Sequence, residues 1–147
     1  MENMEISEIK RFNYLTFEID SAYHDAALKM GLSDSAMLIL YTICNNDGEC
    51  PLSDITRLSG VSKQTINSAL RKLEAENIVT LELFAGKKKK VCITEKGKES
   101  VKHTVMRMIK IENDIFDSWS EKERDMYLDL TLRYLIVFKE KIKEMHF

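Results

Sequence analysis

The period of the apolar residues changes from helical to alternating within residues 51–97, and this change constrains the fold more than any other feature. Two segments come first in which apolar residues recur every three or four positions, separated by a tight turn at Ser59-Gly60-Val61. Two strand-like runs follow at 78–84 and 89–94, joined by Ala85-Gly86-Lys87-Lys88. This order predicts a helix-turn-helix followed by a β-hairpin wing.

The two helices of this motif are predicted from their caps and apolar stripes. Ser53 is expected to cap the first helix, which buries Ile55 and Leu58. Ser62 is expected to cap the second, whose apolar stripe leaves a polar and basic outer face. Such a face can reach base edges and phosphates in a DNA major groove. The predicted DNA-binding residues are Ser62, Lys63, Gln64, Thr65, Asn67, Ser68 and Arg71 on the helix, and Lys87, Lys88, Lys89 and Lys90 in the wing.

The charge distribution supports this interpretation, although the net charge does not. The 147-residue chain has 22 Lys and Arg against 24 Asp and Glu, a net charge of −2. Residues 51–97 alone contain nine basic and five acidic residues, a net of +4, so the remainder carries −6. A basic island on an acidic protein indicates local contact with nucleic acid. A solvated hairpin tip is the alternative explanation for the lysine run, because charge runs alone are common on surfaces.

The remaining chain is predicted to be helical. One long helix is expected at 6–30, ended by Gly31 in a left-handed conformation, and a second runs from a Ser33 cap to about Cys44. Thr94 should cap a helix from Glu95 to Ser118, and Ser120 with Glu123 matches a capping box for a last helix. The terminal helices are more apolar than one small core can cover. They therefore predict either a dimer, which we favour, or a compact monomeric bundle.

Other classes of site find little support in the sequence. Cys44, Cys50 and Cys92 have no CxxC spacing, so neither a disulfide framework nor a zinc site is expected. Cys44 and Cys92 are expected to be buried, and Cys50, in a polar turn, is the one candidate for an exposed redox-sensitive thiol. No catalytic motif is found, so no catalytic residue, metal or cofactor is predicted. Without a signal peptide or a run of about 20 apolar residues, the chain is expected in the cytoplasm and not in a membrane.

Four local motifs resemble those of the MarR family of bacterial transcription regulators. They are Leu32-Ser33 running into Met37 and Leu40, Ser59-Gly60-Val61-Ser62 with Thr65, Ile66, Leu70 and Leu73, the segment Leu73 to Val79, and the segment Ile93 to Lys98. The resemblance implies a mainly α fold with a small β-hairpin wing, formed by a single domain at 1–147. Within it, 33–97 would be the winged helix-turn-helix lobe, and 1–31 and 98–147 the dimerisation helices.

The same resemblance implies a function. It predicts a homodimer that binds a pseudo-palindromic operator in double-stranded DNA and represses transcription until a small molecule releases it. Relatives often bind aromatic effectors, and the candidate lining residues, which ordinary core packing would explain equally well, are Tyr14, Phe17, Tyr23, His24 and Tyr41. The wing tip departs from the family, because lysines stand where many relatives have an Asp and an Arg. The alternative function is a winged-helix module for protein–protein contact without DNA.

Overall fold

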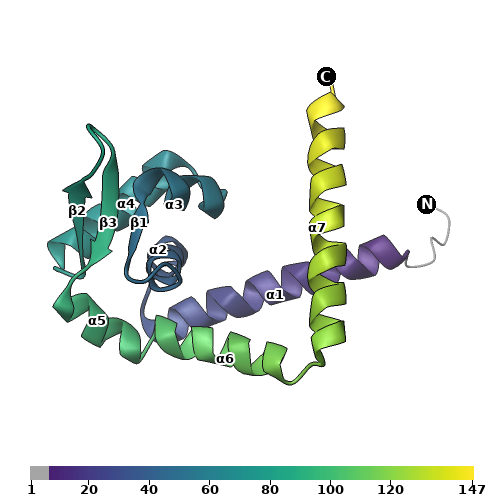
Figure 1. Ribbon diagram of the computed structural model, residues 1–147, viewed down its shortest axis with the longest axis horizontal. Helices are drawn as coiled ribbons and strands as arrows, with labels where there is room; N and C mark the ends of the chain where they lie inside the picture. Colours follow the sequence, from purple (N-terminus) through teal and green to yellow (C-terminus); the bar gives the residue numbers. More distant parts are fainter. Residues whose placement is uncertain (1–6) are drawn as a thin grey trace. The chain divides into compact units, whose positions relative to one another are not determined.

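The computed structural model describes residues 7–147, so Ile6 of the predicted first helix lies outside the described residues. Within that range the chain forms helices with one small antiparallel sheet, as the sequence predicts (Figure 1). The elements are α1 (Glu8–Met30), α2 (Asp34–Cys44), β1 (Glu49–Pro51), α3 (Leu52–Ser59), α4 (Lys63–Ala75), β2 (Val79–Leu83), β3 (Lys89–Ile93), α5 (Glu95–Lys102), α6 (Val105–Asp117) and α7 (Glu121–Glu144). They form two compact units, one up to Ile109 and the other from Lys110 to Phe147.

Capping residues fix the helix boundaries of the first unit. The hydroxyl oxygen of Ser33 accepts a hydrogen bond from the Ala36 N–H at 3.1 Å, and Gly31 has the positive φ of 70° predicted for it. Thr94 likewise accepts from the Gly97 N–H at 2.9 Å and starts α5. The predicted Ser53 cap is wrong. The N-cap is Pro51, two residues earlier, so α3 begins at Leu52 and no side chain caps it.

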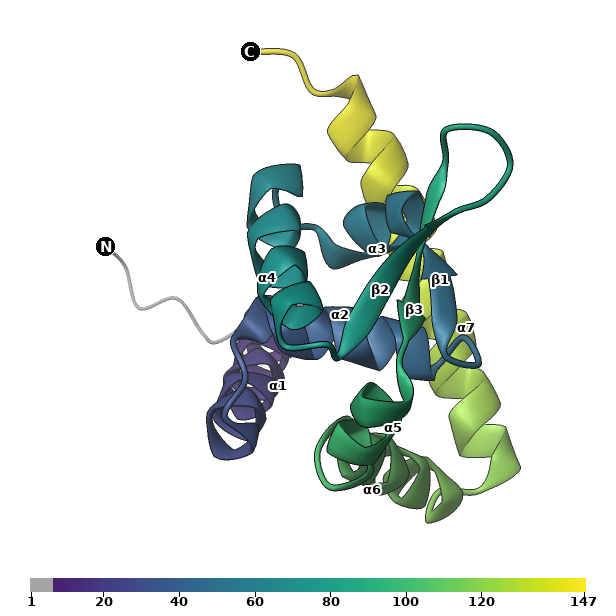
Figure 2. The same ribbon diagram turned by 90° about the vertical axis from the view of Figure 1, so that its left-hand side faces the viewer.

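The sheet has a third strand that the sequence did not predict. Its order is β1-β3-β2, with β3 in the centre and antiparallel to both neighbours (Figure 2). Val91 of β3 lies opposite Cys50 of β1 and Leu81 of β2. β1 has three residues and includes a proline, which an edge strand tolerates because one side needs no ladder hydrogen bonds. Such a segment has no recognisable pattern of its own, and only pairing with β3 makes it a strand.

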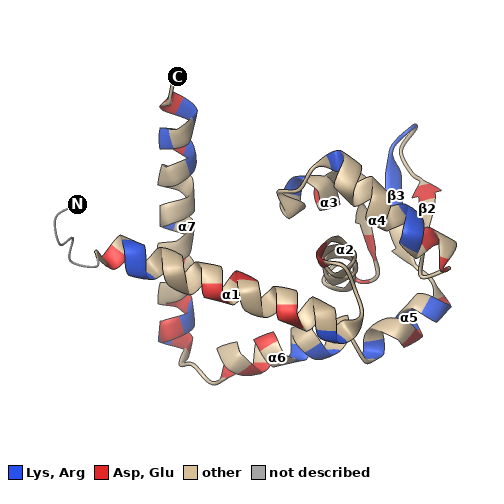
Figure 3. Ribbon diagram, turned by 180° about the vertical axis from the view of Figure 1, so that it is seen from behind, with Lys and Arg blue, Asp and Glu red and all other residues tan. Residues whose placement is uncertain are grey.

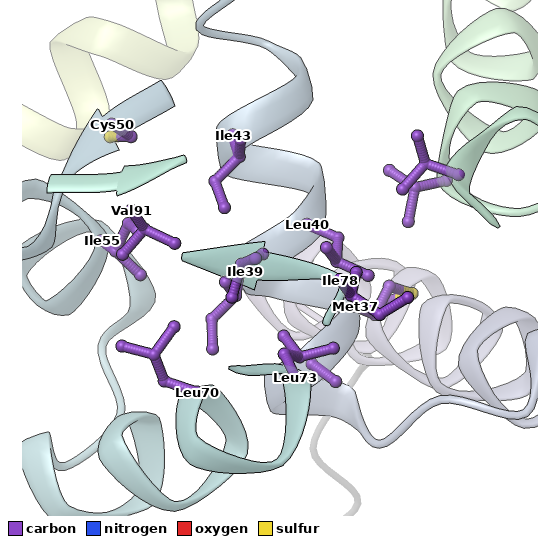
Figure 4. Packing of buried hydrophobic residues seen from close by; sticks show 14 of the residues in the cluster. Met37, Ile39, Leu40, Ile43, Cys50, Ile55, Leu70, Leu73, Ile78 and Val91 are labelled. Atoms are coloured by element: carbon purple, nitrogen blue, oxygen red, sulfur yellow. The ribbon is translucent and has the colours of Figure 1, made fainter. Parts of the chain in front are cut away.

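The core of the first unit lies between α2, α3, α4 and the sheet (Figure 4). Ile39, Ile55, Ile66 and Val91 are essentially inaccessible to solvent, so four different elements meet there. Leu58 was predicted to be buried with Ile55 but is 59% exposed. Three residues along a helix turn a side chain by about 300°, which places Leu58 to one side of the buried face of this short helix.

The contact between α5 and the start of β2 requires a glycine at position 97. A Cβ atom there would collide with the carbonyl oxygen of Ile78 and lie 2.7 Å from Cγ1 of Ile93. The predicted helix from Glu95 to Ser118 is in fact two helices, because the chain breaks at 103–104 between α5 and α6. No glycine or proline marks this break. Val101 and Val105, one on each side of it, are both buried in the core.

The second unit contains the end of α6 and all of α7. Ser120 and Glu123 form the predicted capping box. Arg124 donates hydrogen bonds to the carbonyl oxygens of Phe116, at 3.2 Å, and Trp119, at 2.6 Å, and so closes the end of α6 against the start of α7. No residue between Lys110 and Phe147 is buried, although much of α7 is apolar.

The first helix is also largely exposed. In α1 only Ala27 is buried, near the C-terminal end of the helix, where it packs on the core. Phe12 and Phe17 remain 46% and 63% exposed. Among residues 7–147 no single helix is long and apolar enough to cross a membrane; α1 and α2 meet that test only as a pair, and they are bent by 92° where they join.

Candidate nucleic-acid interface

The N-terminal turn of α4 presents hydrogen-bond donors to solvent. The Ser62 hydroxyl accepts from the Thr65 N–H at 3.1 Å and lies 2.7 Å from the Thr65 hydroxyl. Lys63 and Gln64 follow directly and are exposed. The first turn contains no acidic residue, so no carboxylate offsets the positive end of the helix dipole. This turn is therefore favourable for a DNA phosphate and for side chains that reach past it.

The outer face of α4 continues this polar surface. Gln64, Ser68 and Arg71 are exposed and recur at the spacing of one helix face. Asn67 is half-buried, so it is less accessible than the other predicted contacts on this helix. The opposite face buries Ile66, Leu70 and Leu73, as the sequence predicts. This packing fixes the rotation of α4, and with it the direction of the polar row.

The wing places its four lysines in two different environments. Ala85 and Gly86 adopt positive φ angles at the tip, and Lys87, Lys88 and Lys89 are exposed there. Lys90 instead donates from Nζ to Oε2 of Glu49 at 3.0 Å, and this hydrogen bond raises the pKa of Lys90. The ion pair partly satisfies Lys90 before any ligand binds.

A cavity of about 540 Å³ lies between α3, the first turn of α4 and the wing tip. We refer to it as the α3–wing cavity. Its cationic lining residues are Arg57, Lys63, Lys87, Lys88 and Lys89. Figure 3 shows the basic colouring of α3 and of the wing on this part of the molecule. Arg57 and the cavity itself have no signature in the sequence, because α3 and the wing are about thirty residues apart.

The five residues predicted to line an effector site divide into two groups. Tyr23 and Tyr41 are half-buried and pack against the core. Tyr14 and Phe17 are more than half exposed and lie nine and six residues of helix from Tyr23, which corresponds to about 14 and 9 Å. Nδ1 of His24 lies 2.9 Å from both carboxylate oxygens of Asp34, across the junction of α1 and α2. None of the five residues lines the α3–wing cavity or the smaller cavity of about 60 Å³ beside Gly31 and Ala69.

The exposure of the three cysteines is the opposite of that expected from the sequence. Cys50 is buried, whereas Cys44 and Cys92 are partly accessible. Cys50 points inward because it alternates with exposed Glu49 in β1. Burial, and then the carboxylate of Asp54, raise the pKa of the Cys50 thiol. Burial also raises the pKa of Cys92, and Glu82, 3.4 Å from its sulfur, raises it further. Cys50 is therefore not the exposed low-pKa thiol that a redox sensor needs.

Among residues 7–147 no group of three His, Cys, Asp or Glu side chains is placed to hold a metal ion.

Together, the capped α4, its polar face and the basic wing define a winged helix-turn-helix lobe. The family model that matches the chain is that of the MarR family, over residues 30–89. No curated protein matches the sequence. The resemblance stated from the sequence is confirmed: residues 30–89 are a MarR-family segment, and the described fold is that of MarR-family structures.

Three solved structures illustrate this likeness. A MarR family regulator from Neisseria meningitidis has a TM-score of 0.78 at 18% identity, over 94% of this chain and 98% of that chain. The S. aureus MepR–DNA complex has a TM-score of 0.69 at 16% identity, over 90% and 97%. NadR in complex with 4-hydroxyphenylacetate has a TM-score of 0.69 at 13% identity, over 92% and 97%. At identities of 13–18%, the likeness to these structures shows the fold alone.

Proposed function

We propose that this protein is a sequence-specific DNA-binding transcriptional regulator that acts as a homodimer on a pseudo-palindromic operator. The observation that carries the proposal is the outer face of α4, which is polar and basic from its Ser62 cap to Arg71 within a MarR-type fold. The solved structures of similar fold include a DNA complex of MepR. In this role α4 enters the major groove, and its N-terminal residues contact the base edges.

The residues predicted from the sequence take distinct roles in this proposal. Ser62 and the free N–H groups of its turn bind a phosphate. Lys63 and Gln64 reach bases, since an amide can bond adenine and an ammonium can bond guanine. Arg71, two turns further along, contacts guanine or the backbone. Lys87, Lys88 and Lys89 of the wing tip bind phosphates and add affinity that is independent of sequence. Lys90, which Glu49 already holds in an ion pair, has no part in this role.

The homodimer is supported by the exposed apolar faces of the terminal helices. α7 exposes about half of the surface of many large apolar side chains, including Tyr134, Leu135, Phe138 and Ile142. Apolar surface of this extent marks an interface rather than a solvated helix. A two-fold axis between two copies would present two α4 helices to one side of the duplex. Half-site centres about 10 bp apart then follow from the helical repeat of DNA.

Selection of bound duplexes from a random pool with the purified full chain tests this proposal. The expected product is a pseudo-palindrome whose half-sites are separated by about one helical turn. A pool without enrichment over a heparin-competed control would contradict DNA recognition. Enrichment of single half-sites would contradict the dimer while leaving α4 as the reading helix. The alternative, a protein-interaction module, would call for an acidic or apolar outer face on α4, unlike the one described here.

We further propose that the regulator is a repressor released by a small aromatic molecule. Tyr23 of α1 and Tyr41 of α2, both partly buried against the core, are the aromatic residues that we assign to such a ligand. The NadR structure of similar fold contains 4-hydroxyphenylacetate. The test adds a panel of aromatic acids to the preformed operator complex. Release of DNA by one compound, weakened by Tyr41→Phe or Tyr23→Ala, is expected. Release that is unchanged in both variants would place the effector site elsewhere.

A further inference from the structure

We propose that the α3–wing cavity holds the stretch of DNA backbone that separates the major from the minor groove, with Arg57 and Lys89 as phosphate ligands. This inference rests on the proposed function. It assigns a DNA-contacting role to α3, which neither the sequence motifs nor the family resemblance singled out in this chain. When α4 occupies the major groove and the wing approaches the adjacent minor groove, one sugar–phosphate strand must pass between them. The cavity lies at that position.

The charge of the cavity fits a polyanion. Five cationic side chains line it, from α3, α4 and the wing. The acidic partner described beside them is Asp54, whose Oδ1 lies 3.4 Å from Nη2 of Arg57. That pair is weak, because both side chains are well exposed, at 69% for Arg57 and 42% for Asp54. An arriving phosphate can therefore engage Arg57 without breaking a buried ion pair, and an arginine fork suits phosphate oxygens.

The start of α3 adds neutral donors to the same wall. Leu52 and Ser53 line the cavity and occupy the first turn of this eight-residue helix. Pro51 stands at the N-cap position and has no hydroxyl or carboxylate to accept from the N–H groups that follow. These N–H groups and the Ser53 hydroxyl can accordingly bind phosphate oxygens once the cations have attracted the DNA backbone. Asp54 in the same turn opposes the positive end of the helix dipole, so the attraction comes from the cations.

The cavity is large enough to admit a length of backbone and not only a single ion. Its volume of about 540 Å³ is many times the ~30 Å³ that one water occupies in the liquid. A phosphate alone would leave most of this space empty, whereas a phosphate with its deoxyribose would fill more of it. Leu52 and the aliphatic stems of the lysines supply apolar surface for the sugar.

Two adjacent lysines of β3 provide a matched pair for the test. Side chains alternate along a strand, so Lys89 shares its direction with Val91, which faces the helices, and it lines the cavity. Lys90 points to the opposite side of the sheet, where it pairs with Glu49. The two residues have the same charge and length and are neighbours in sequence, but only Lys89 reaches the cavity.

The experiment measures binding of the full-length chain to the operator selected from the random pool, over a series of salt concentrations. Arg57→Gln and Lys89→Gln should each lower affinity about tenfold at 0.1 M salt, as expected for a lost charge-assisted bond. Each should also flatten the log–log salt dependence by about one unit without changing the preferred sequence. Lys90→Gln should change affinity less than twofold. Equal effects of Lys89→Gln and Lys90→Gln, or no effect of Arg57→Gln, would overturn the inference.

Uncharged linkages in the DNA backbone then locate the phosphate that Arg57 contacts. Single methylphosphonates are placed along the operator, and binding by the unaltered chain is compared with binding by Arg57→Gln. At one phosphate in each half-site, the methylphosphonate should weaken binding by the unaltered chain about tenfold. It should hardly affect binding by Arg57→Gln, because that variant has already lost the contact. Additive losses at every phosphate would overturn the assignment of Arg57. Circular dichroism checks that the variants fold.

Two further outcomes keep this inference separate from the proposed function. If an operator is selected and both cavity variants bind it like the unaltered chain, the cavity has no role in binding DNA while the regulator stands. If no operator is selected, the proposed function itself fails. Inorganic tripolyphosphate is the probe for a free ligand. Its tight binding to the chain, lost in Arg57→Gln while operator affinity is unchanged, would identify a soluble phosphate compound and overturn the assignment to the DNA backbone.

Discussion

The winged lobe buries many of its apolar side chains, whereas the last helix leaves its apolar side chains exposed. In the first unit, residues such as Ile39, Ile66 and Val91 are fully buried by elements of the same chain. In α7, Leu135 and Phe138 remain 44% and 51% exposed, and no residue from Lys110 to Phe147 is buried. The first unit therefore contains its own core, whereas the apolar side chains of α7 stay accessible to solvent. This contrast underlies our proposal that the lobe reads DNA and that α7 takes part in the association of two copies.

The largest effect is expected from breaking the α7 side of this contrast. Leu135→Glu combined with Phe138→Glu puts two carboxylates on the proposed interface, where a buried unpaired charge is very costly. The variant should become monomeric and lose at least 100-fold in operator affinity, because the two half-sites are no longer bound together. Sedimentation equilibrium and fluorescence anisotropy measure the two quantities. The control, Arg133→Glu with Glu140→Lys on the polar side of the helix, should remain dimeric. A double-glutamate variant that still has the mass of two copies would remove α7 from the interface.

The converse experiment damages the lobe and spares the terminal helices. Lys63→Ala with Gln64→Ala removes two exposed side chains from each α4 helix. Each base contact contributes roughly 1–3 kcal/mol, so specific affinity should fall about 100-fold toward the non-specific level. The dimer and the thermal midpoint should not change, because neither side chain is buried. Anisotropy titrations with operator and scrambled duplexes measure the loss, and an unaltered operator affinity would exclude α4 from base recognition.

Packing inside the lobe is tested at two glycines. Gly97→Ala forces a methyl group against the Ile78 carbonyl and should lower the free energy of unfolding by about 2 kcal/mol. Gly86→Ala at the wing tip meets no atom within 4 Å, and it should cost about 1 kcal/mol through the positive φ of 78° alone. Urea unfolding followed by circular dichroism compares the two. Equal costs would show that α5 is not held tightly against the sheet.

The smallest expected effect concerns the thiols, all three of which lie in the lobe. Burial raises the pKa of Cys44 and Cys50 above the ordinary 9.0, and burial with Glu82 does the same for Cys92. Thiolate is therefore scarcer at pH 8 than in free cysteine, and reaction with a disulfide reagent should be slower, slowest at Cys50. Labelling of Cys50 at the rate of free cysteine would contradict its burial.

The same shifts have a consequence for stability. A raised thiol pKa means that the folded chain favours the protonated form. This contribution to stability is fully present below about pH 9 and is lost as the pH rises through the folded pKa values. Urea unfolding at pH 8 and pH 10, with Cys50→Ala as control, measures the difference. A free energy of unfolding that is larger at pH 10 than at pH 8, with the difference absent in Cys50→Ala, would contradict the expected direction.

Much of the fold could be predicted because its signals are local. The caps at Ser33, Ser62 and Thr94 and the box at Ser120 each act over three residues, and all are present in the structure. The strands on each side of the wing alternate only approximately, but their β-branched residues and the turn between them mark them as a hairpin. β1 was missed because three residues do not establish a period, and the break between α5 and α6 was missed because no Gly or Pro marks it. The predicted exposure of Cys50 was wrong for the first of these reasons, since its inward direction follows from β1.

The sequence by itself determined the helix-turn-helix, the wing and the polar face of α4, because helix period and capping depend on neighbours within one or two turns. Only the tertiary structure decided that Arg57 joins the wing lysines around one cavity, that Lys90 pairs with Glu49, and that Cys50 enters the core. These contacts join residues about thirty to forty positions apart. Their partners are set by strand pairing and by the packing of α3 against the sheet, which no local pattern specifies.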